Sequence, residues 1–153
     1  MPDGSIPLLI AIIALLVLSA FFSSTETCFS CANKIKLRAL ATSGNKRAKK
    51  VLDLAEDNYD ELISTVLIGN NIVNITAATL STLLFVLLLK NKPNVDSAFV
   101  STIVMTVATL IFGEITPKLI AKVYPEKTAM LYYPIITAFI YVFWIFNRIF
   151  GKA

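Results

Sequence analysis

Polar residues gather at three places where this sequence is otherwise apolar, and each place offers oxygen atoms that could bind a cation. The first is the run Phe22-Ser-Ser-Thr-Glu-Thr27, in which Ser23, Glu26, Thr27 and Ser30 are spaced to share one helix face. Polar groups are costly in a membrane helix and are functional candidates there. Hydroxyls can instead bond back to their own helix, but the Glu26 carboxylate needs a partner at that depth.

Three asparagines form the second cluster, within Gly69-Asn-Asn-Ile-Val-Asn74. Asn70 and Asn74 share a helix face at a spacing of four residues, and Asn71 lies beside them. Such carboxamides can join helices through hydrogen bonds worth about 0.6–2 kcal/mol each. They can also bind a ligand, and their density in so short a segment favours this second interpretation.

The third cluster is Phe112-Gly-Glu-Ile-Thr-Pro-Lys118. Pro117 has no N–H, and in an α-helix that N–H would bond the Gly113 carbonyl. The sequence therefore predicts an interrupted helix with a free carbonyl oxygen beside the Glu114 carboxylate, an arrangement that can hold a cation. A purely structural kink is the alternative, but it leaves Glu114 unexplained.

Long apolar segments must position these clusters. A membrane-spanning helix needs roughly 20 apolar residues, and we predict three such helices, at about residues 6–32, 62–89 and 98–123. A fourth segment, Ala129–Phe150, is apolar but rich in Tyr, Trp and Phe. Because these aromatic residues are typical of the membrane interface, we expect juxtamembrane helices at residues 126–150, with a full span as the alternative.

The basic residues predict the orientation. Seven of the fourteen basic residues lie between the first two apolar segments: Lys34, Lys36, Arg38, Lys46, Arg47, Lys49 and Lys50. The positive-inside rule places this connection, residues 33–61, in the cytoplasm. The N-terminus is then outside, three spans put the C-terminus in the cytoplasm, and all three polar clusters fall in the inner half of the bilayer. Helical spacing with a break at Ser43-Gly44-Asn45 makes the connection a helical hairpin.

The composition agrees with one all-α integral membrane domain over residues 1–153. Of the 153 residues, 56% are apolar and 16% are charged, against about 25% charged in an ordinary soluble domain. These values exclude a disordered chain and disfavour a water-soluble globule. Histidine is absent, which excludes a His-based zinc site or general base. The sequence has no nucleophile–base pair or cofactor fingerprint, so we expect neither an enzyme nor a nucleic-acid partner.

The three clusters share one ligand chemistry. Their donors are carboxylate, carboxamide, hydroxyl and backbone carbonyl oxygens, without imidazole. Oxygen ligands suit hard cations, so Mg²⁺ is the first expectation, and Na⁺ and Ca²⁺ are the alternatives.

With these motifs the sequence resembles the transmembrane domain of the CorC/CNNM (cyclin-M) magnesium transporter family over nearly its whole length. The resemblance is carried by Ser19-Ala-Phe-Phe-Ser-Ser-Thr-Glu-Thr27, Ile35-Lys-Leu-Arg38, Ile68-Gly-Asn-Asn-Ile-Val-Asn74 and Phe112-Gly-Glu-Ile-Thr-Pro-Lys118. The family's first motif usually reads F-S-G-S-E-T. Here Ser24 replaces the glycine and Thr25 the second serine, while Ser23 is retained.

The resemblance implies three spanning helices with juxtamembrane helices, a homodimer in the lipid of the plasma membrane, and export of Mg²⁺ from the cytoplasm coupled to Na⁺ entry. Full-length proteins of this family continue into cytoplasmic CBS domains that bind ATP with Mg²⁺. We therefore expect this chain to be a membrane domain without its CBS domains.

Two functions agree with these expectations. The first is Mg²⁺ transport, with the ion bound by Ser23, Asn70, Asn74, Glu114 and the carbonyl of Gly113. Further residues would support this site from adjacent positions or bind Na⁺: Thr25, Glu26, Ser30, Asn71 and Pro117. The second is a membrane-anchored dimeric module that senses Mg²⁺ without transporting it.

Overall fold

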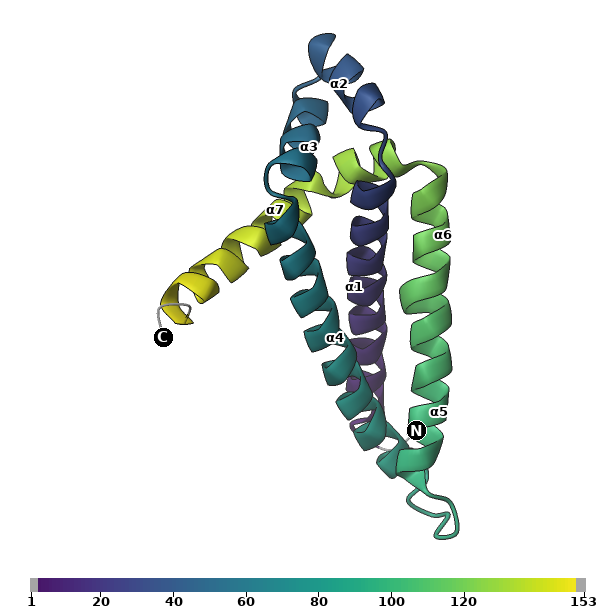
Figure 1. Cartoon of the computed structure of the whole chain (residues 1–153). Coiled ribbons are helices and arrows are strands. Elements are labelled where there is room, and N and C mark those ends of the chain that lie inside the picture. The colour runs from purple at the N-terminus through teal and green to yellow at the C-terminus, as the bar shows by residue number, and fades with distance from the viewer. Residues whose placement is uncertain (1–2, 151–153) are drawn as a thin grey trace. The chain divides into compact units, whose positions relative to one another are not determined.

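The computed structural model of the chain describes residues 3–150, without the side chains at 147, 149 and 150. Its elements are α1 (Ser5–Cys31), α2 (Lys34–Thr42), α3 (Lys46–Glu56), α4 (Tyr59–Leu88), α5 (Ser97–Ala108), the π-helical segment η1 (Thr109–Ile115), α6 (Thr116–Val123) and α7 (Pro125–Phe150) (Figure 1). No strand occurs in this part of the chain, so the all-α prediction is confirmed. The predicted placement of the two termini concerns residues 1–2 and 151–153, which lie outside the described residues.

Four helical stretches are long and apolar enough to cross a membrane: Ser5–Cys31, Tyr59–Leu88, Ser97–Val123 and Pro125–Phe146. The chain is thus a multi-pass membrane protein, as predicted. The first three stretches lie within three residues of the predicted spans. The fourth stretch also qualifies by length and composition, which supports the alternative prediction that the C-terminal segment spans the membrane. α4 begins at Tyr59, three residues before the predicted start of the second span at about residue 62.

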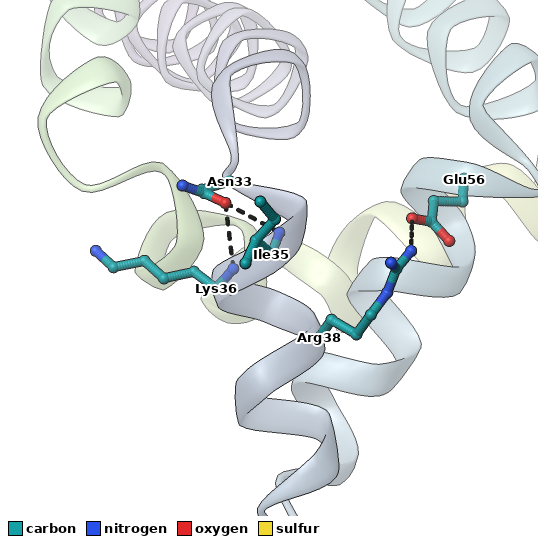
Figure 2. A network of polar contacts seen from close by, with 5 residues as sticks. All are labelled: Asn33, Ile35, Lys36, Arg38 and Glu56. Atoms are coloured by element: carbon teal, nitrogen blue, oxygen red, sulfur yellow. Dashed lines mark hydrogen bonds and ion pairs between the residues drawn. The ribbon is translucent and has the colours of Figure 1, made fainter.

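Side-chain caps fix where three of the helices begin. Asn33 accepts hydrogen bonds from the backbone of Ile35 and Lys36 at the start of α2, as Figure 2 shows. Asn45 and Asp96 cap α3 and α5 in the same way, which satisfies amide groups that have no partner inside the helix. The break predicted at residues 43–45 is present. Gly44 there has a φ of +104°, a backbone conformation that would be strained for a residue with a side chain.

The chain divides into two compact units. The first contains residues 1–23 and 69–117, and its apolar core is formed by Ile12, Ala77, Leu84 and Met105, with leucines packed around them. At one end of this unit Ser19 of α1 bonds to Asn70 of α4. The lower-numbered residues of α1 meet the higher-numbered residues of α4, so the two helices run antiparallel.

The second unit contains residues 24–68 and 118–153. Here α3 packs against both α2 and α7 through a buried face formed by Ala48, Val51, Leu52, Leu54 and Ala55. An ion pair between Arg38 and Glu56, 2.8 Å long, joins α2 to α3 (Figure 2). The backbone N–H of Asn33 donates to the Glu126 carboxylate at 3.1 Å and so ties the start of α2 to α7.

Candidate cation site

Ser19 lies where three helical segments of the first unit meet. Its hydroxyl donates to the side-chain oxygen of Asn70 on α4 at 3.1 Å. The same Oγ lies 2.9 Å from the point that a Cβ on Gly113 of η1 would occupy. Ser19 is completely buried. Gly113 is therefore needed for the close approach of η1 to α1, and Ser19, Asn70 and Gly113 form one polar junction.

Ser23 follows Ser19 by one helical turn and so lies on the same face of α1. Its side chain is only 1% exposed, and its hydroxyl has no hydrogen-bond partner among the described residues. Leaving a buried polar group unpaired costs about 1–3 kcal/mol. Such a group in a native structure calls for an explanation, and an ion-binding role is one that suits a hydroxyl oxygen.

The π-helical segment changes how Pro117 acts. The N–H of Thr116 donates to the carbonyl of Ile111, five residues back. In that register residue 117 would donate to the Phe112 carbonyl, and in an α-helical register it would donate to Gly113. Proline has no N–H to donate, so in the observed register the carbonyl that lacks this donor is that of Phe112, whereas the sequence predicted that of Gly113.

Helical structure continues from Ser97 to Val123, so the third helix is not broken at Pro117, but η1 interrupts its α-helical register. In a regular α-helix the proline ring would clash with the carbonyl four residues back. The wider π-helical turns in front of Pro117 relieve that clash, and the helix is widened instead of broken. Short π-helical segments are rare and frequently occur at functional sites.

Two of the predicted ligands lie at different levels. Because α1 and α4 are antiparallel, Ser23 and Asn74 each lie one turn from the Ser19–Asn70 pair, in opposite directions. Eight residues of rise separate them by about 12 Å along the helix axes. Oxygen ligands lie roughly 2.0–2.6 Å from Mg²⁺ or Ca²⁺. Ser23 and Asn74 therefore do not reach the same ion in this arrangement.

Glu114 directly follows Gly113 and is half-buried. Neither ion pair found in the described part of the chain involves it. Nor do the described residues contain any group of three or more His, Cys, Asp or Glu side chains that could hold a metal ion. Glu114 is therefore the carboxylate nearest in sequence to this junction, and the other oxygens of the junction are neutral.

The supporting residues predicted on α1 already have protein partners. The Glu26 carboxylate lies 3.5 Å from the Lys118 ammonium, which gives it an oppositely charged partner. Ser30 donates to the Glu26 carbonyl at 2.7 Å and lies 2.9 Å from the Tyr59 hydroxyl. Thr25 is buried, and its backbone carbonyl accepts a hydrogen bond from the Cys28 thiol. These three predicted residues belong to the second unit.

The two remaining supporting residues belong to the first unit. Asn71 is exposed on α4, and Pro117 is buried as the second residue of α6. Pro117 affects the junction through the backbone carbonyl that it leaves without a donor. Asn71 lies on the exposed side of its helix.

Sequence reasoning missed Ser19 as a site residue, although it stands in the motif that carried the resemblance. Its spacing of four residues from Ser23 is the signal that could have identified it. A second close contact was also missed. A Cβ on Gly69 would lie 2.6 Å from the ring of Phe22, which is 2% exposed. Gly69 thus makes room for a buried aromatic ring one residue before Asn70.

Comparison with known proteins identifies the family. A family model described as the cyclin M transmembrane N-terminal domain matches residues 10–153. The chain belongs to this family. The UPF0053 inner membrane protein YfjD of Escherichia coli is 43% identical to this cyclin M domain over 112 residues, which cover 73% of the chain. A UPF0053 protein of Haemophilus influenzae is 38% identical over 156 residues, which cover 97% of the chain.

A third relative, from Haemophilus influenzae, is named polyamine export protein. It is 30% identical over 154 residues, which cover 92% of the cyclin M domain. The matched regions make up 25%, 36% and 35% of these three relatives, so the chain spans about a quarter to a third of their length.

Proposed function

We propose that this cyclin M domain transports Mg²⁺ across the cell membrane through the junction of Ser19, Asn70 and Gly113. The observation that carries the proposal is the completely buried, unpartnered hydroxyl of Ser23, one turn from that junction. It is supported by the carbonyls next to Pro117 and by the Glu114 carboxylate. Transport is outward, from the cytoplasm, and is coupled to Na⁺ entry.

The donor set suits Mg²⁺ for a physical reason. Mg²⁺ gives up its water ligands reluctantly and is usually bound by one or two carboxylates while it keeps several waters. Glu114 supplies the charge, and Asn70, Ser23 and a carbonyl at Gly113 or Phe112 supply neutral oxygens. Asn74 lies one turn away from this level and would contact the ion at another stage of its passage.

The membrane arrangement belongs to the same proposal. The basic connection with α2 and α3 lies in the cytoplasm, the N-terminus lies outside, and α7 lies along the inner leaflet. The domain acts as a homodimer, and cytoplasmic CBS domains of the longer protein regulate it. A dimeric module that senses Mg²⁺ without moving it would use the same ligands and differ only in lacking flux.

A second candidate substrate is a polyamine, as the name of one relative suggests. One observation favours it. A cavity of about 200 Å³ in the second unit is lined by Asp60, Glu61, Phe143 and Trp144, among other residues. Carboxylates and aromatic rings together suit an organic ammonium group. This cavity would serve a polyamine, whereas the Glu114 carboxylate would serve Mg²⁺.

Replacing Glu114 with glutamine tests the proposal, and Glu61→Gln is the matched control. In liposomes, Glu114→Gln should abolish Mg²⁺ flux and Mg²⁺ binding by calorimetry, because the ion loses its only charged ligand, and Glu61→Gln should leave both unchanged. Binding without flux in the parent protein would favour the sensing module. Spermidine flux that depends on Glu61 but not on Glu114 would favour the polyamine. Near-parental Mg²⁺ binding in folded Glu114→Gln would refute the assignment.

A further inference from the structure

A basic cleft lies between α3 and α7 in the second unit, away from the proposed ion junction. It is a cavity of about 280 Å³ lined by Lys46, Arg47, Lys50, Tyr133 and Pro134. Three of these five residues are cationic, and the tyrosine adds a phenolic hydroxyl. This combination of donors is suited to phosphate oxygens.

The cations of the cleft form no ion pair with a carboxylate of the described residues. The ion pairs formed by the described residues are Arg38–Glu56 and Lys118–Glu26, and neither involves a cation of the cleft. The first turn of α3 contains no acidic residue. Since Lys46 and Arg47 open this helix, the positive end of its dipole adds to their charge. The cleft therefore attracts an anion.

A neighbouring cavity determines which part of the groove the anion would occupy. It shares Lys50 and Tyr133 with the basic cleft but is also lined by Asp53 and Glu61. Those carboxylates repel an anion. The anion is therefore favoured at the end formed by Lys46 and Arg47. Lys50 and Tyr133, which line both cavities, mark the boundary of this end.

The packing of α3 on α7 places the cleft at the membrane surface. α7 is apolar enough to enter a bilayer over Pro125–Phe146. α3 packs against it, and the Asn45 amide lies 3.9 Å from the Met130 sulfur. Four of the first five residues of α3 are basic, so this end of α3 cannot enter hydrocarbon. Tyr133 and Pro134 lie near the middle of Pro125–Phe146, so the cleft lies at the level of the lipid headgroups when α7 lies along the inner leaflet, an arrangement taken from the proposed function.

We propose that this cleft binds the phosphate of an anionic membrane phospholipid. Lys46, Arg47 and Lys50 pair with the phosphate oxygens, and the Tyr133 hydroxyl donates a further hydrogen bond. Arginine can contact two phosphate oxygens at once, and tyrosine is enriched at the headgroup level of membrane proteins. The lipid would fasten α3 to α7, and this proposal does not depend on which ion the domain transports.

The test compares two triple variants that remove the same charge from the same connection. The cleft variant is K46Q/R47Q/K50Q, and the control is K34Q/K36Q/K49Q, whose residues do not line the cleft. Each protein is reconstituted in nanodiscs that contain phosphatidylglycerol and phosphatidylcholine. Native mass spectrometry after transfer to detergent then measures how much of each lipid stays bound. Circular dichroism checks that both variants remain helical.

The parent should retain phosphatidylglycerol in preference to phosphatidylcholine. Each basic residue near a membrane surface contributes about a fivefold effect on binding of anionic lipid. The cleft variant should therefore lose more than about tenfold of this preference. The control should keep most of it, because after transfer to detergent only residues that contact the bound lipid still contribute. Tyr133→Phe, which leaves the packing of the ring intact, should lose part of it. The charge-preserving variant K46R/K50R should bind as the parent does.

Three results would overturn the proposal. Equal losses in the cleft variant and the control would mean that the whole basic surface attracts lipid without a site. Inorganic phosphate that displaces phosphatidylglycerol from the parent at millimolar concentration, or that stabilises the parent as much as the lipid does, would mean that the cleft serves a soluble phosphate instead. Unchanged lipid retention in both Tyr133→Phe and the folded cleft variant would exclude the cleft as the binding position.

Discussion

The hydroxyl of Ser19 donates a hydrogen bond of 3.1 Å to the side-chain oxygen of Asn70, and this bond holds the carboxamide in one orientation at the helix junction. A carboxamide oxygen has two lone pairs. With one lone pair engaged by Ser19, the other is available to an ion. The geometry of the proposed ligand on α4 thus depends on a residue of α1.

Ser19→Ala should therefore weaken Mg²⁺ binding through Asn70. We expect Asn70→Ala to weaken it as well, and the double variant to lose less than the sum of the two single losses. Residues that share one network usually show coupling of about 0.5–3 kcal/mol. Calorimetry on the parent, both single variants and the double variant measures this coupling. Strictly additive losses would show that Ser19 does not act through Asn70.

Gly113→Ala should disturb the same junction from the third helix. The new Cβ would lie 2.9 Å from the Ser19 hydroxyl oxygen, so the hydroxyl must move and its bond to Asn70 is lost. Overpacking of this kind typically costs about 1–3 kcal/mol. We expect a lower melting temperature and weaker Mg²⁺ binding. In a Ser19→Ala background, which removes the clashing oxygen, the drop in melting temperature caused by Gly113→Ala should shrink.

Pro117→Ala should separate the ion-binding role of the proline from a structural one. Alanine restores an N–H that can bond the carbonyl of Phe112 or Gly113, and it is about 3 kcal/mol better than proline inside a helix. The variant should be at least as stable as the parent without Mg²⁺ but gain less from Mg²⁺. Melting temperatures with and without the ion measure this difference. Equal Mg²⁺-induced shifts in both proteins would refute the role assigned to these carbonyls.

Ser81 and Ser101 provide a test of stability away from the junction. Their buried hydroxyls lie 2.8 Å apart and join α4 to α5. Ser101→Ala leaves the Ser81 hydroxyl unpaired and should cost about 1–3 kcal/mol of stability. Removing both hydroxyls should cost less than removing one. Chemical unfolding measures the stability, and Mg²⁺ affinity should stay unchanged in all three variants.

Hydropathy and charge could predict the helices of this fold, because a membrane helix needs a long apolar stretch and local caps fix its ends. Asn33 and Asn45 are cap residues that can be recognised in the sequence. The π-helical segment could not be predicted, since a proline inside a helix can also kink the helix or end it. Sequence spacing grouped Ser23 with Asn74 as ligands. It could not reveal the antiparallel register of α1 and α4, which separates them.

The π-helical segment also has a geometrical consequence for the whole third helix. Buried residues recur along it at intervals of four: Ser101, Met105, Gly113, Pro117 and Ala121, with half-buried Thr109 filling the gap. In a regular α-helix each step of four residues advances about 40° around the axis, so five steps would carry the stripe to the opposite side. The π-helical turns of η1 hold more residues than α-helical turns, so the buried residues rotate in the opposite direction around the axis over this segment. The segment therefore offsets the rotation that the α-helical parts accumulate, and the buried residues from Ser101 to Ala121 stay on one face of the helix.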